Sequence, residues 1–473
     1  MSKEQSGVTD DGISIGEIAE KLSKTSFWTL VVSFLSQISE EIKNVLNRIF
    51  GDSIHRLISG VKSIREILYI FLYSRIIRAP AFILIILLIS AGWMGNSAKD
   101  FQQQINGDVE VYLPDGANST DLLLEVREQW STDIVLLYIH TNNAIEDVSL
   151  GCAFPEGPTG MLVARGASIL AGIPDTAAAN VINRYCGSAM TSLHLVSSAI
   201  EAGDIQVGIA GGVEDMFTIP QGGFAPDFNV KLAEEDYYIS MGEGAELLAD
   251  ELSISREEQE DFAINSHEKA LAAQEAGKFD NEIIPIALED GSTFEKDTGP
   301  KKPNVEKIKS LNPAFRADGT VTAATSSPFS IGASAMLLTS EEYAKEHGLK
   351  IRASVEGRAV AGVNWRMFGS GPIPATEKAL KNTGLTIDDI DAMEINEAFA
   401  AQSLYCIKKA DWDINKINLN GGAVALGHPL GISGTRIITT LLNVMEQQDR
   451  SMGLATMCVG TGMGITTIIK RGE

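Results

Sequence analysis

Two residues stand at positions from which they could carry out nucleophilic chemistry. Cys186 lies in "NRYCGSAM", directly before a run whose apolar spacing predicts a helix that ends at Gly203. The unpaired amides at a helix N-terminus stabilise a thiolate, so we expect the pKa of this thiol to fall below the free value of about 8.5. His428 lies on a Gly-rich turn that leads into another predicted helix, where it could serve as the base for a thiol. Taken alone, each of these two residues could equally well have a structural role and no catalytic one.

Two further segments place an amide and a thiol at the ends of predicted strands. Asn396 opens "NEAFA" after the strand "IDAMEI", where a helix cap is the default interpretation of Asn and Glu. Cys458 follows the predicted strand 454–457 and precedes "VGTGMG", whose alternating glycines permit close approach of the backbone. Because this Gly-rich run precedes the final predicted strand and does not open a helix after the first one, we exclude a dinucleotide site.

Composition narrows the function classes. A chain of 473 residues can form two or three domains, and 44% hydrophobic with 21% charged residues is typical of globular proteins. The chain has 38 Lys and Arg residues against 62 Asp and Glu residues. This excess of acidic residues argues against a nucleic-acid partner, because nucleic acids bind to basic protein surfaces. The four cysteines form no CxxC pair, which excludes a disulfide scaffold and a cysteine-cage zinc site, so we expect no metal.

The first 146 residues differ from the rest of the chain in their pattern of apolar and charged residues. Residues 1–78 carry apolar positions at helical spacing between charged ones, which predicts amphipathic helices. Residues 79–98 contain no charged side chain and match the roughly 20 residues that cross a bilayer, so they predict a transmembrane helix, with a buried core helix as the alternative. Arg75 and Arg78 precede this span, and the positive-inside rule would then place the following residues outside the cell.

Residues 99–146 predict a compact βαβ unit, with strands at 109–113 and 133–140 and a helix at 119–129. The run from Arg78 to Asp115 resembles the start of the resistance-nodulation-division and MMPL-type exporters, in which the first helix leads into a porter domain. The later membrane helices of such exporters have no counterpart in this sequence. We therefore do not expect this chain to transport a substrate by itself.

From residue 147 onward, apolar strands alternate with helical patterns and Gly-rich turns, which predicts an α/β fold with a mainly parallel sheet. Four motifs occur here in the order "NRYCGSA", "NEAF", "GGAVALGHPLGISG" and "CVGTGMG". Together they resemble the motifs of the thiolase family, the acetyl-CoA C-acyltransferases. The family patterns are N-x-x-C-x-S-G, N-E-A-F, G-G-x-x-x-x-G-H-P-x-G-x-S-G and C-x-G-x-G-x-G. The resemblance extends from about residue 147 to the C-terminus.

The resemblance implies a role for each motif residue. Cys186 would be the acylated nucleophile, His428 would activate it and contribute to an oxyanion hole, and Asn396 would hold a water in that hole. Cys458 would protonate the acetyl-CoA enolate and later deprotonate the incoming CoA. The amides of Cys186 and Gly460 would form a second oxyanion hole. CoA is then a cosubstrate, and no metal or other cofactor is needed, because a thiolate and a thioester suffice for acyl transfer.

The resemblance also implies substrate-binding residues, for which a purely structural role is the alternative. The positions at which the family lines its pantetheine tunnel are occupied here by Met241, Ser327, Phe368, Ala398 and Phe399. Simple packing is the alternative, above all for Met241 and Phe368, whose side chains are usually found in cores. The basic stretch Lys301–Lys309 could meet the CoA phosphates, although a charge run is more often a solvated face.

The sequence also departs from the family pattern. Ala189 and Thr461 replace frequent glycines, and a methyl group at a close-approach position could disturb the start of the helix. Family members begin with a strand, an R-T-P loop and a helix, but here the exporter-like segment occupies that place. We expect this loss to remove a central strand of the first half. The βαβ unit before residue 147 could substitute, but its side chains are not patterned for this core, so a fusion or defective product is the more economical explanation.

These observations predict a helical N-terminal region with one transmembrane helix, followed by a five-layer αβαβα fold of two similar halves. The halves are residues 147–345, including a loop domain at 215–320, and residues 346–473. The predicted activity is thiolysis of 3-ketoacyl-CoA to acetyl-CoA and a shortened acyl-CoA. The alternatives are an acetoacetyl-CoA-forming thiolase and a non-catalytic, membrane-anchored fusion. By family, we expect a cytoplasmic homodimer or homotetramer, which would be membrane-anchored if the predicted span is genuine.

Overall fold

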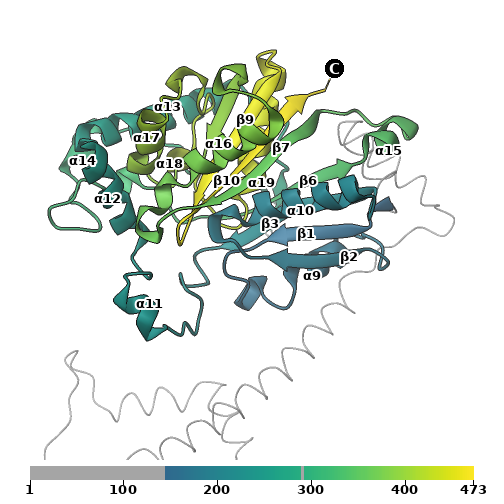
Figure 1. The fold of residues 1–473 in the computed structure, drawn as a ribbon, viewed down its shortest axis with the longest axis horizontal. Helices are drawn as coiled ribbons and strands as arrows, with labels where there is room; N and C mark the ends of the chain where they lie inside the picture. Colours follow the sequence, from purple (N-terminus) through teal and green to yellow (C-terminus); the bar gives the residue numbers. More distant parts are fainter. Residues whose placement is uncertain (1–143, 289–291, 473) are drawn as a thin grey trace, which may run out of the picture. The chain divides into compact units, whose positions relative to one another are not determined.

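The computed structural model describes residues 144–288 and 292–472. They form two halves, each built on a four-stranded sheet, with the strand orders β2-β1-β3-β6 and β7-β10-β9-β8 (Figure 1). The amphipathic region 1–78, the predicted membrane span 79–98 and nearly all of the exporter-like segment 99–146 lie outside the described residues. Within the described residues, no helix combines the length and the apolar character that crossing a membrane requires.

The first half has three parallel strands and one antiparallel strand at its edge. Its elements are β1 (Asp147–Gly151), α9 (Val163–Leu170), β2 (Ala178–Ile182), α10 (Ser188–Ala202), β3 (Val207–Asp215), β6 (Ile331–Thr339) and α15 (Glu341–Glu346). Helix α10 ends as predicted at Gly203, whose φ of +80° is a left-handed conformation that glycine adopts without strain.

The second half has a similar arrangement, but its sheet has an additional strand, β7, at the start and no strand in the place of β2. Its elements are β7 (Ala353–Gly362), α16 (Pro372–Thr383), β8 (Ala392–Ile395), α17 (Ala400–Lys409), α18 (Ala423–Leu426), α19 (Ser433–Gln447), β9 (Met452–Val459) and β10 (Met463–Arg471). Strands β8 and β9 are parallel, and β10 pairs antiparallel with both β9 and β7. The Gly-rich run after Cys458 therefore forms the turn before the final strand, as predicted.

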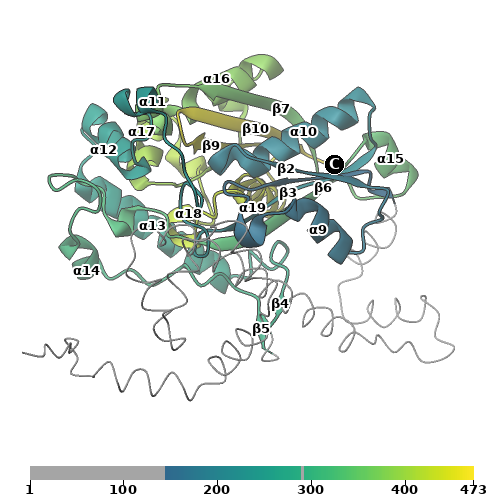
Figure 2. The ribbon, with the colours of Figure 1, turned by 90° about the horizontal axis from the view of Figure 1, so that it is seen from below.

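Helices α10 and α19 form a shared layer between the two sheets. Helix α10 contacts β1 and β3, α19 contacts β8 and β9, and the two helices contact each other. Helix α9 covers the outer face of the first sheet and α16 covers the outer face of the second (Figure 2). This arrangement confirms the predicted five-layer αβαβα fold. Its centre is apolar, because Met190, Leu193, Ile437 and Leu441 are at most 1% exposed.

The chain between β3 and β6 forms a separate group of helices beside the second half. These elements are α11 (Val230–Glu234), α12 (Met241–Leu252), α13 (Arg256–Glu275), β4 (Ile286–Ala287), β5 (Thr293–Phe294) and α14 (Val305–Ser310). Helix α13 begins with a capping box, in which Ser255 and Glu258 satisfy each other's backbone amides. Helix α12 contacts α17, so this group packs against the helices that follow the "NEAF" segment.

Comparison of the halves corrects the prediction about the absent strand. The order β8-α17-α19-β9-β10 corresponds to β1-α9-α10-β3-β6, so β7 and α16 have no counterpart among the described residues of the first half. Because β7 lies on the outer side of β10, the absent strand would lie at the edge beside β6 and not in the centre of the sheet. Residues 464–469 of β10 are all buried, whereas no residue of β6 is. The four remaining strands stay contiguous.

Candidate active site

Cys186 lies in a short 3-10 turn, η3 (Tyr185–Gly187), between β2 and the start of α10. Tyr185 adopts a φ of +43°, which is strained for a residue that carries a Cβ. Ser188 stabilises this turn, because its hydroxyl donates to the Tyr185 carbonyl oxygen at 2.6 Å and accepts from the Arg184 amide at 2.9 Å. The strained turn thus fixes Cys186, the predicted nucleophile, at the N-terminus of α10.

The prediction of a lowered thiol pKa at this position is wrong. Cys186 is 9% exposed, and burial raises its pKa to about 11. The amides of Gly460 and of Cys186 itself act in the opposite direction but do not offset the desolvation, and the Glu214 carboxylate raises the pKa slightly further. The thiol is therefore protonated at neutral pH, and it needs a base when it reacts.

His428 lies between α18 and α19, next to Gly427, whose φ of +101° is accessible to glycine alone at low cost. The imidazole is 3% exposed and has a hydrogen-bond partner at each nitrogen. Nε2 lies 3.3 Å from Asn396 Nδ2, and Nδ1 lies 2.6 Å from Ser433 Oγ. Burial, and next the Arg436 guanidinium, lower the pKa of His428 to about 3, so the ring is neutral.

These partners assign the tautomer of His428. An amide nitrogen only donates, so Nε2 accepts from Asn396 and carries no proton. The ring proton is then on Nδ1 and is donated to Ser433 Oγ, which in turn donates to the Pro429 carbonyl oxygen at 2.9 Å. The unprotonated Nε2 is the atom that can take a proton from a thiol.

Asn396 and Cys458 lie close together at the ends of β8 and β9. The Asn396 amide donates to the Thr456 carbonyl oxygen at 3.0 Å, and Cys458 follows two residues later on β9. The Asn396 Oδ1 atom is buried and has no partner among the described residues, as expected of an atom that binds a water or a substrate. Burial, with Cys186 and Cys406 nearby, raises the pKa of Cys458 well above its ordinary value, so this thiol holds its proton.

Gly460 and the predicted tunnel residues surround Cys458. A Cβ built at Gly460 would lie 3.5 Å from Met241 Sδ and 3.7 Å from the Tyr185 ring, so this backbone faces both a predicted tunnel residue and the turn that carries Cys186. Four of the tunnel residues pack on Cys458 in one cluster: Met241, Phe368, Ala398 and Phe399. The fifth, Ser327, donates its amide to the Ala398 carbonyl oxygen at 3.0 Å. The structure thus brings all five together.

Ala189 and Thr461, which replace glycines of the family pattern, differ in their effect on the backbone. Ala189 is fully buried inside α10 and does not have a positive φ, so the helix begins at Ser188 without disturbance. Thr461 has a φ of +66°, which is strained for a β-branched residue, and its hydroxyl donates to the Gly460 carbonyl oxygen at 2.5 Å. The strain is therefore confined to the turn between β9 and β10.

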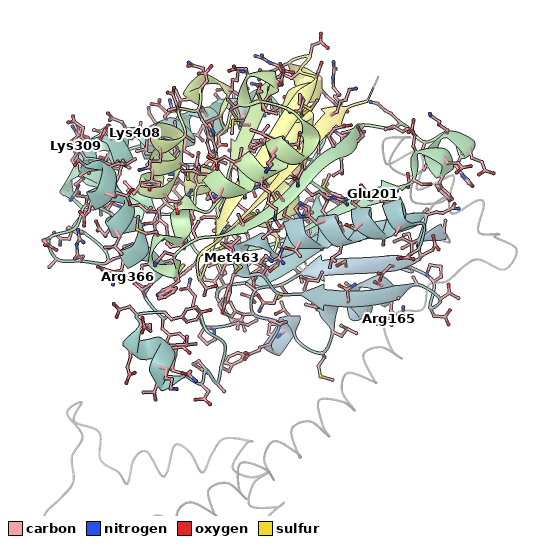
Figure 3. The ribbon with its side chains drawn as sticks, viewed as in Figure 1. Arg165, Glu201, Lys309, Arg366, Lys408 and Met463 are labelled. Carbon is pink, nitrogen blue, oxygen red and sulfur yellow. The ribbon has the colours of Figure 1, made fainter. Side chains whose placement is uncertain are left out.

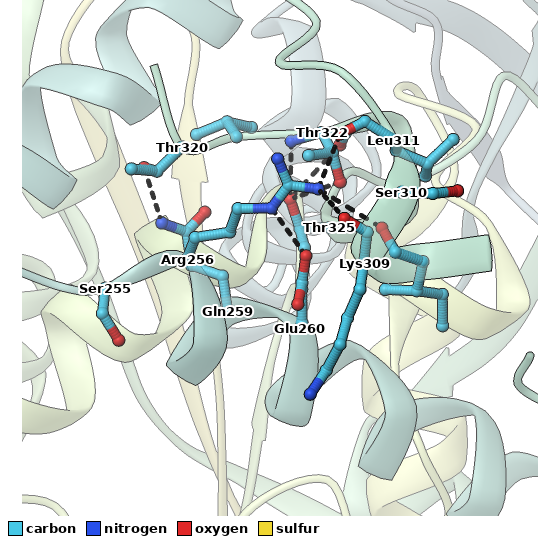
Figure 4. Close-up of polar contacts among 12 residues, drawn as sticks. Ser255, Arg256, Gln259, Glu260, Lys309, Ser310, Leu311, Thr320, Thr322 and Thr325 are labelled. Carbon is cyan, nitrogen blue, oxygen red and sulfur yellow. Dashed lines mark hydrogen bonds and ion pairs between the residues drawn. The ribbon is translucent and has the colours of Figure 1, made fainter. Parts of the chain in front are cut away.

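The basic stretch Lys301–Lys309 is exposed and is attached to the rest of the molecule by Arg256. The Arg256 Nη2 atom donates to the carbonyl oxygens of Lys309 at 3.2 Å and Leu311 at 2.6 Å, and its Nε pairs with Glu260 at 2.6 Å (Figure 4). Figure 3 shows Lys309 at the outer edge of this group of helices. Met463 lies more centrally in that view, beside a pocket that is also lined by Asn183, Arg184 and Tyr185.

The sequence patterns did not indicate three residues that bond to His428 or to the segment that carries it: Ser433, Glu397 and Glu214. Ser433 lies within the third motif and in the first turn of α19, which is the signal that could have paired it with His428. Glu397 was interpreted as a helix cap, but its carboxylate instead accepts from Ser266, Asn418 and the Val424 amide. Glu214 contacts a turn that lies 217 residues away in the chain, so no local pattern could indicate it.

Comparison with known proteins identifies relatives over the described region. The model of the thiolase N-terminal domain matches residues 137–342, and that of the thiolase C-terminal domain matches residues 349–471. The chain is 49% identical over 341 residues to a 3-ketoacyl-CoA thiolase of Photobacterium profundum, covering 70% of this chain and 88% of the relative. It is 48% identical over 339 residues to a 3-ketoacyl-CoA thiolase of Vibrio parahaemolyticus, covering 69% and 86%. Neither domain model reaches upstream of residue 137, so the exporter-like interpretation stays a prediction.

Two solved structures share the fold. The Bacillus anthracis acetyl-CoA acetyltransferase matches with a TM-score of 0.64 at 37% identity, covering 70% of this chain and 88% of that one. The human mitochondrial 3-ketoacyl-CoA thiolase matches with a TM-score of 0.67 at 33% identity, covering 72% of this chain and 91% of that one. The relatives therefore correspond to the described part of the chain nearly over their full length.

Proposed function

The chain belongs to the thiolase family and is an acyl-CoA C-acyltransferase, and we propose that it cleaves 3-ketoacyl-CoA with CoA to acetyl-CoA and a shortened acyl-CoA. The single observation that carries the proposal is the hydrogen-bonded series Asn396, His428 and Ser433, in which the proton of a neutral imidazole is on Nδ1 and the unprotonated Nε2 is an acceptor. The 3-ketoacyl-CoA thiolases at 48–49% identity support the substrate class.

In the first half-reaction, His428 Nε2 takes the proton of the Cys186 thiol, and the sulfur attacks the C3 carbonyl carbon. The oxyanion is stabilised by the new Nε2–H and by a water held at Asn396, whose buried Oδ1 atom has a free acceptor position. The C2–C3 bond then breaks, and the Cys458 thiol gives its proton to the acetyl-CoA enolate. Acetyl-CoA leaves, with the acyl group on Cys186, a proton on His428 and a thiolate at Cys458.

In the second half-reaction, the Cys458 thiolate removes the proton from the incoming CoA thiol, and the CoA sulfur attacks the acyl-cysteine. The amides of Cys186 and Gly460 are the proposed donors to this second oxyanion. The Cys186 thiolate leaves and regains its proton from His428, which restores the resting enzyme. CoA serves as the cosubstrate, and no step needs a metal ion or another cofactor.

The binding residues belong to the same proposal. We place the pantetheine arm against Met241, Ser327, Phe368, Ala398 and Phe399, which cluster beside Cys458. The exposed lysines of Lys301–Lys309 are the proposed partners of the CoA phosphates. By family, we propose a homodimer or homotetramer located in the cytoplasm. Membrane association through residues 79–98 remains a prediction, because these residues lie outside those that the structure describes.

A second candidate is condensation to acetoacetyl-CoA, favoured by the 37% identity to an acetyl-CoA acetyltransferase. Acyl-chain preference separates the two, because a condensing enzyme would act best on the four-carbon substrate and a degradative one on longer chains. Both run through an acyl-enzyme at Cys186.

The decisive experiment is acylation of the purified full-length protein by acetyl-CoA, measured by intact mass and peptide mapping, with Cys186→Ala as the control. We expect one acetyl group on Cys186 in the wild type and none in the variant. A folded wild-type protein that stays unlabelled would refute the proposal. It would favour the non-catalytic fusion, in which the edge of β6, which pairs with no further strand among the described residues, has impaired the site.

A further inference from the structure

Two buried carboxylates hold the turn that carries His428, here called the His428 turn (residues 421–433). Glu397 holds its first part and is 2% exposed. Its Oε2 atom accepts from the Val424 amide at 3.1 Å and from Ser266 Oγ at 2.6 Å, while Oε1 accepts from Asn418 Nδ2 at 2.8 Å. The three donors come from three different segments, so this carboxylate connects the His428 turn to both α13 and the chain beside β8.

Glu214 holds the last part of the His428 turn from the other half of the molecule. It lies on β3, is fully buried, and its Oε2 atom accepts from the amides of Gly431 and Ala153, both at 2.7 Å. Its Oε1 atom accepts from the Phe154 amide at 3.3 Å and from the Cys152 thiol at 3.6 Å. A Cβ built on Gly431 would lie 2.7 Å from both the Cys152 Cα and Glu214 Oε2. The turn is thus pressed against the first half at this point.

Neither carboxylate takes part in the chemical steps above, and both are bonded within four residues of His428. We propose that Glu214 and Glu397 are positioning residues, which set the place of His428 Nε2 relative to Cys186 by holding the His428 turn at two points. This inference rests on the proposed function, because it assigns His428 as the base.

A glutamate side chain is suited to holding a turn in place. A carboxylate only accepts, so one side chain can satisfy several N–H and O–H donors at once, and charge strengthens each bond. Burial raises the pKa of both carboxyl groups, and the hydrogen bonds from these donors lower it only in part, so the ionised form depends on keeping the donors. A buried carboxylate with this many partners resists displacement, because each lost bond would leave a buried polar group unpaired.

Substitution by glutamine tests the idea with little change in shape. In Glu397→Gln, the amide oxygen can keep the two donors at Oε2, but the new NH₂ group then faces Asn418 Nδ2. Asn418 cannot turn over to accept, because its Oδ1 and Nδ2 are both bonded to the backbone of Ile395 at 2.9 Å. In Glu214→Gln, the NH₂ group faces the longer contact to the Phe154 amide and the Cys152 thiol, whose sulfur can turn from donor to weak acceptor. We therefore expect the larger effect from Glu397→Gln.

Glu246→Gln is the matched control. Glu246 is also fully buried and accepts from two amides, those of Thr320 and Val321 at 2.8–3.0 Å, but it does not bond to the His428 turn. The readouts are kcat, the KM for CoA and the thermal unfolding midpoint of the full-length chain. We expect Glu397→Gln to lower kcat about 10- to 100-fold and Glu214→Gln to lower it less, with the KM for CoA changed less than about twofold. Glu246→Gln should lower the midpoint but keep kcat.

An unchanged kcat in both Gln variants would overturn the proposal, and so would an equal loss in Glu246→Gln. If Glu397→Gln does not fold, Glu214→Gln and Ser266→Ala are judged by the same criteria. If the wild type shows no thiolysis, the proposed function fails, but alkylation of Cys186 by iodoacetamide at mildly alkaline pH still tests the positioning. The alkylation rate should fall in both Gln variants towards that of His428→Ala, and an unchanged rate would refute the role.

Discussion

Removal of the Ser433 hydroxyl tests the assigned tautomer of His428. In Ser433→Ala, the buried Nδ1–H loses the acceptor that lies 2.6 Å away, and the Pro429 carbonyl oxygen loses a donor at 2.9 Å. An unsatisfied buried donor costs about 1–3 kcal/mol. The imidazole can avoid this cost by moving its proton to Nε2, but there it meets the Asn396 amide, which also donates.

Either outcome weakens the base. If the whole cost falls on the reactive state, about 1–3 kcal/mol corresponds to a loss of about 5- to 150-fold in kcat/KM. The assay is steady-state thiolysis of a 3-ketoacyl-CoA, combined with ¹⁵N NMR of the histidine rings to locate the proton. Ser403→Ala is a suitable control, because Ser403 is fully buried and its Oγ has no hydrogen-bond partner among the described residues.

The reasoning would be refuted if Ser433→Ala kept both full activity and the proton on Nδ1. An equal loss in Ser403→Ala would also refute it, since the effect would then come from the loss of a buried hydroxyl in general. A loss confined to Ser433→Ala, with a shift of the ring proton, is the expected result.

Three further predictions follow from burial and backbone conformation. In His428→Ala, which lacks the base, alkylation of Cys186 by iodoacetamide should rise about tenfold per pH unit across the neutral and alkaline range below about pH 11, because the pKa of the thiol is about 11, and a plateau near neutral pH would contradict this. Gly427→Ala should lower the free energy of unfolding by about 1–3 kcal/mol in denaturant titrations, because its φ is +101° and the new Cβ would lie 2.4 Å from Ser330 Oγ; an unchanged free energy would show that the turn adapts. Burial raises the pKa of Glu394 from 4.5 to about 8, so the folded state binds this proton more tightly and stability falls as pH rises between these values. Glu394→Gln should flatten that fall in thermal unfolding, and an unchanged slope would show that other groups cause it.

Local sequence patterns predicted the main strands and helices of the two halves and, through the family resemblance, the candidate residues of the site. The apolar spacing before Gly203 and the alternation of strands with helices were visible in the chain, since they depend on neighbouring residues. The motifs around Cys186, His428, Asn396 and Cys458 indicated which groups could react. The structure brings Asn396 into contact with His428 and places Cys458 among the predicted tunnel residues.

Long-range packing decided what the patterns could not. The pKa of the Cys186 thiol is raised because surrounding segments exclude water from it, and this desolvation outweighs the helix N-terminus. The edge position of the strand that has no counterpart among residues 144–288 and 292–472 follows from the pairing of β7 with β10, which is set by sheet order and not by order along the chain.

The surroundings of His428 also show which features are local in the sequence and which depend on tertiary packing. The sequence by itself determined that a histidine stands on a Gly-rich turn before a helix, because that arrangement is local. Only the tertiary structure decided that Glu214, from the other half, and Glu397, from the preceding strand end, bond to the two parts of that turn. The physical reason is that a buried carboxylate needs several donors at once, and these donors come together only when distant segments pack.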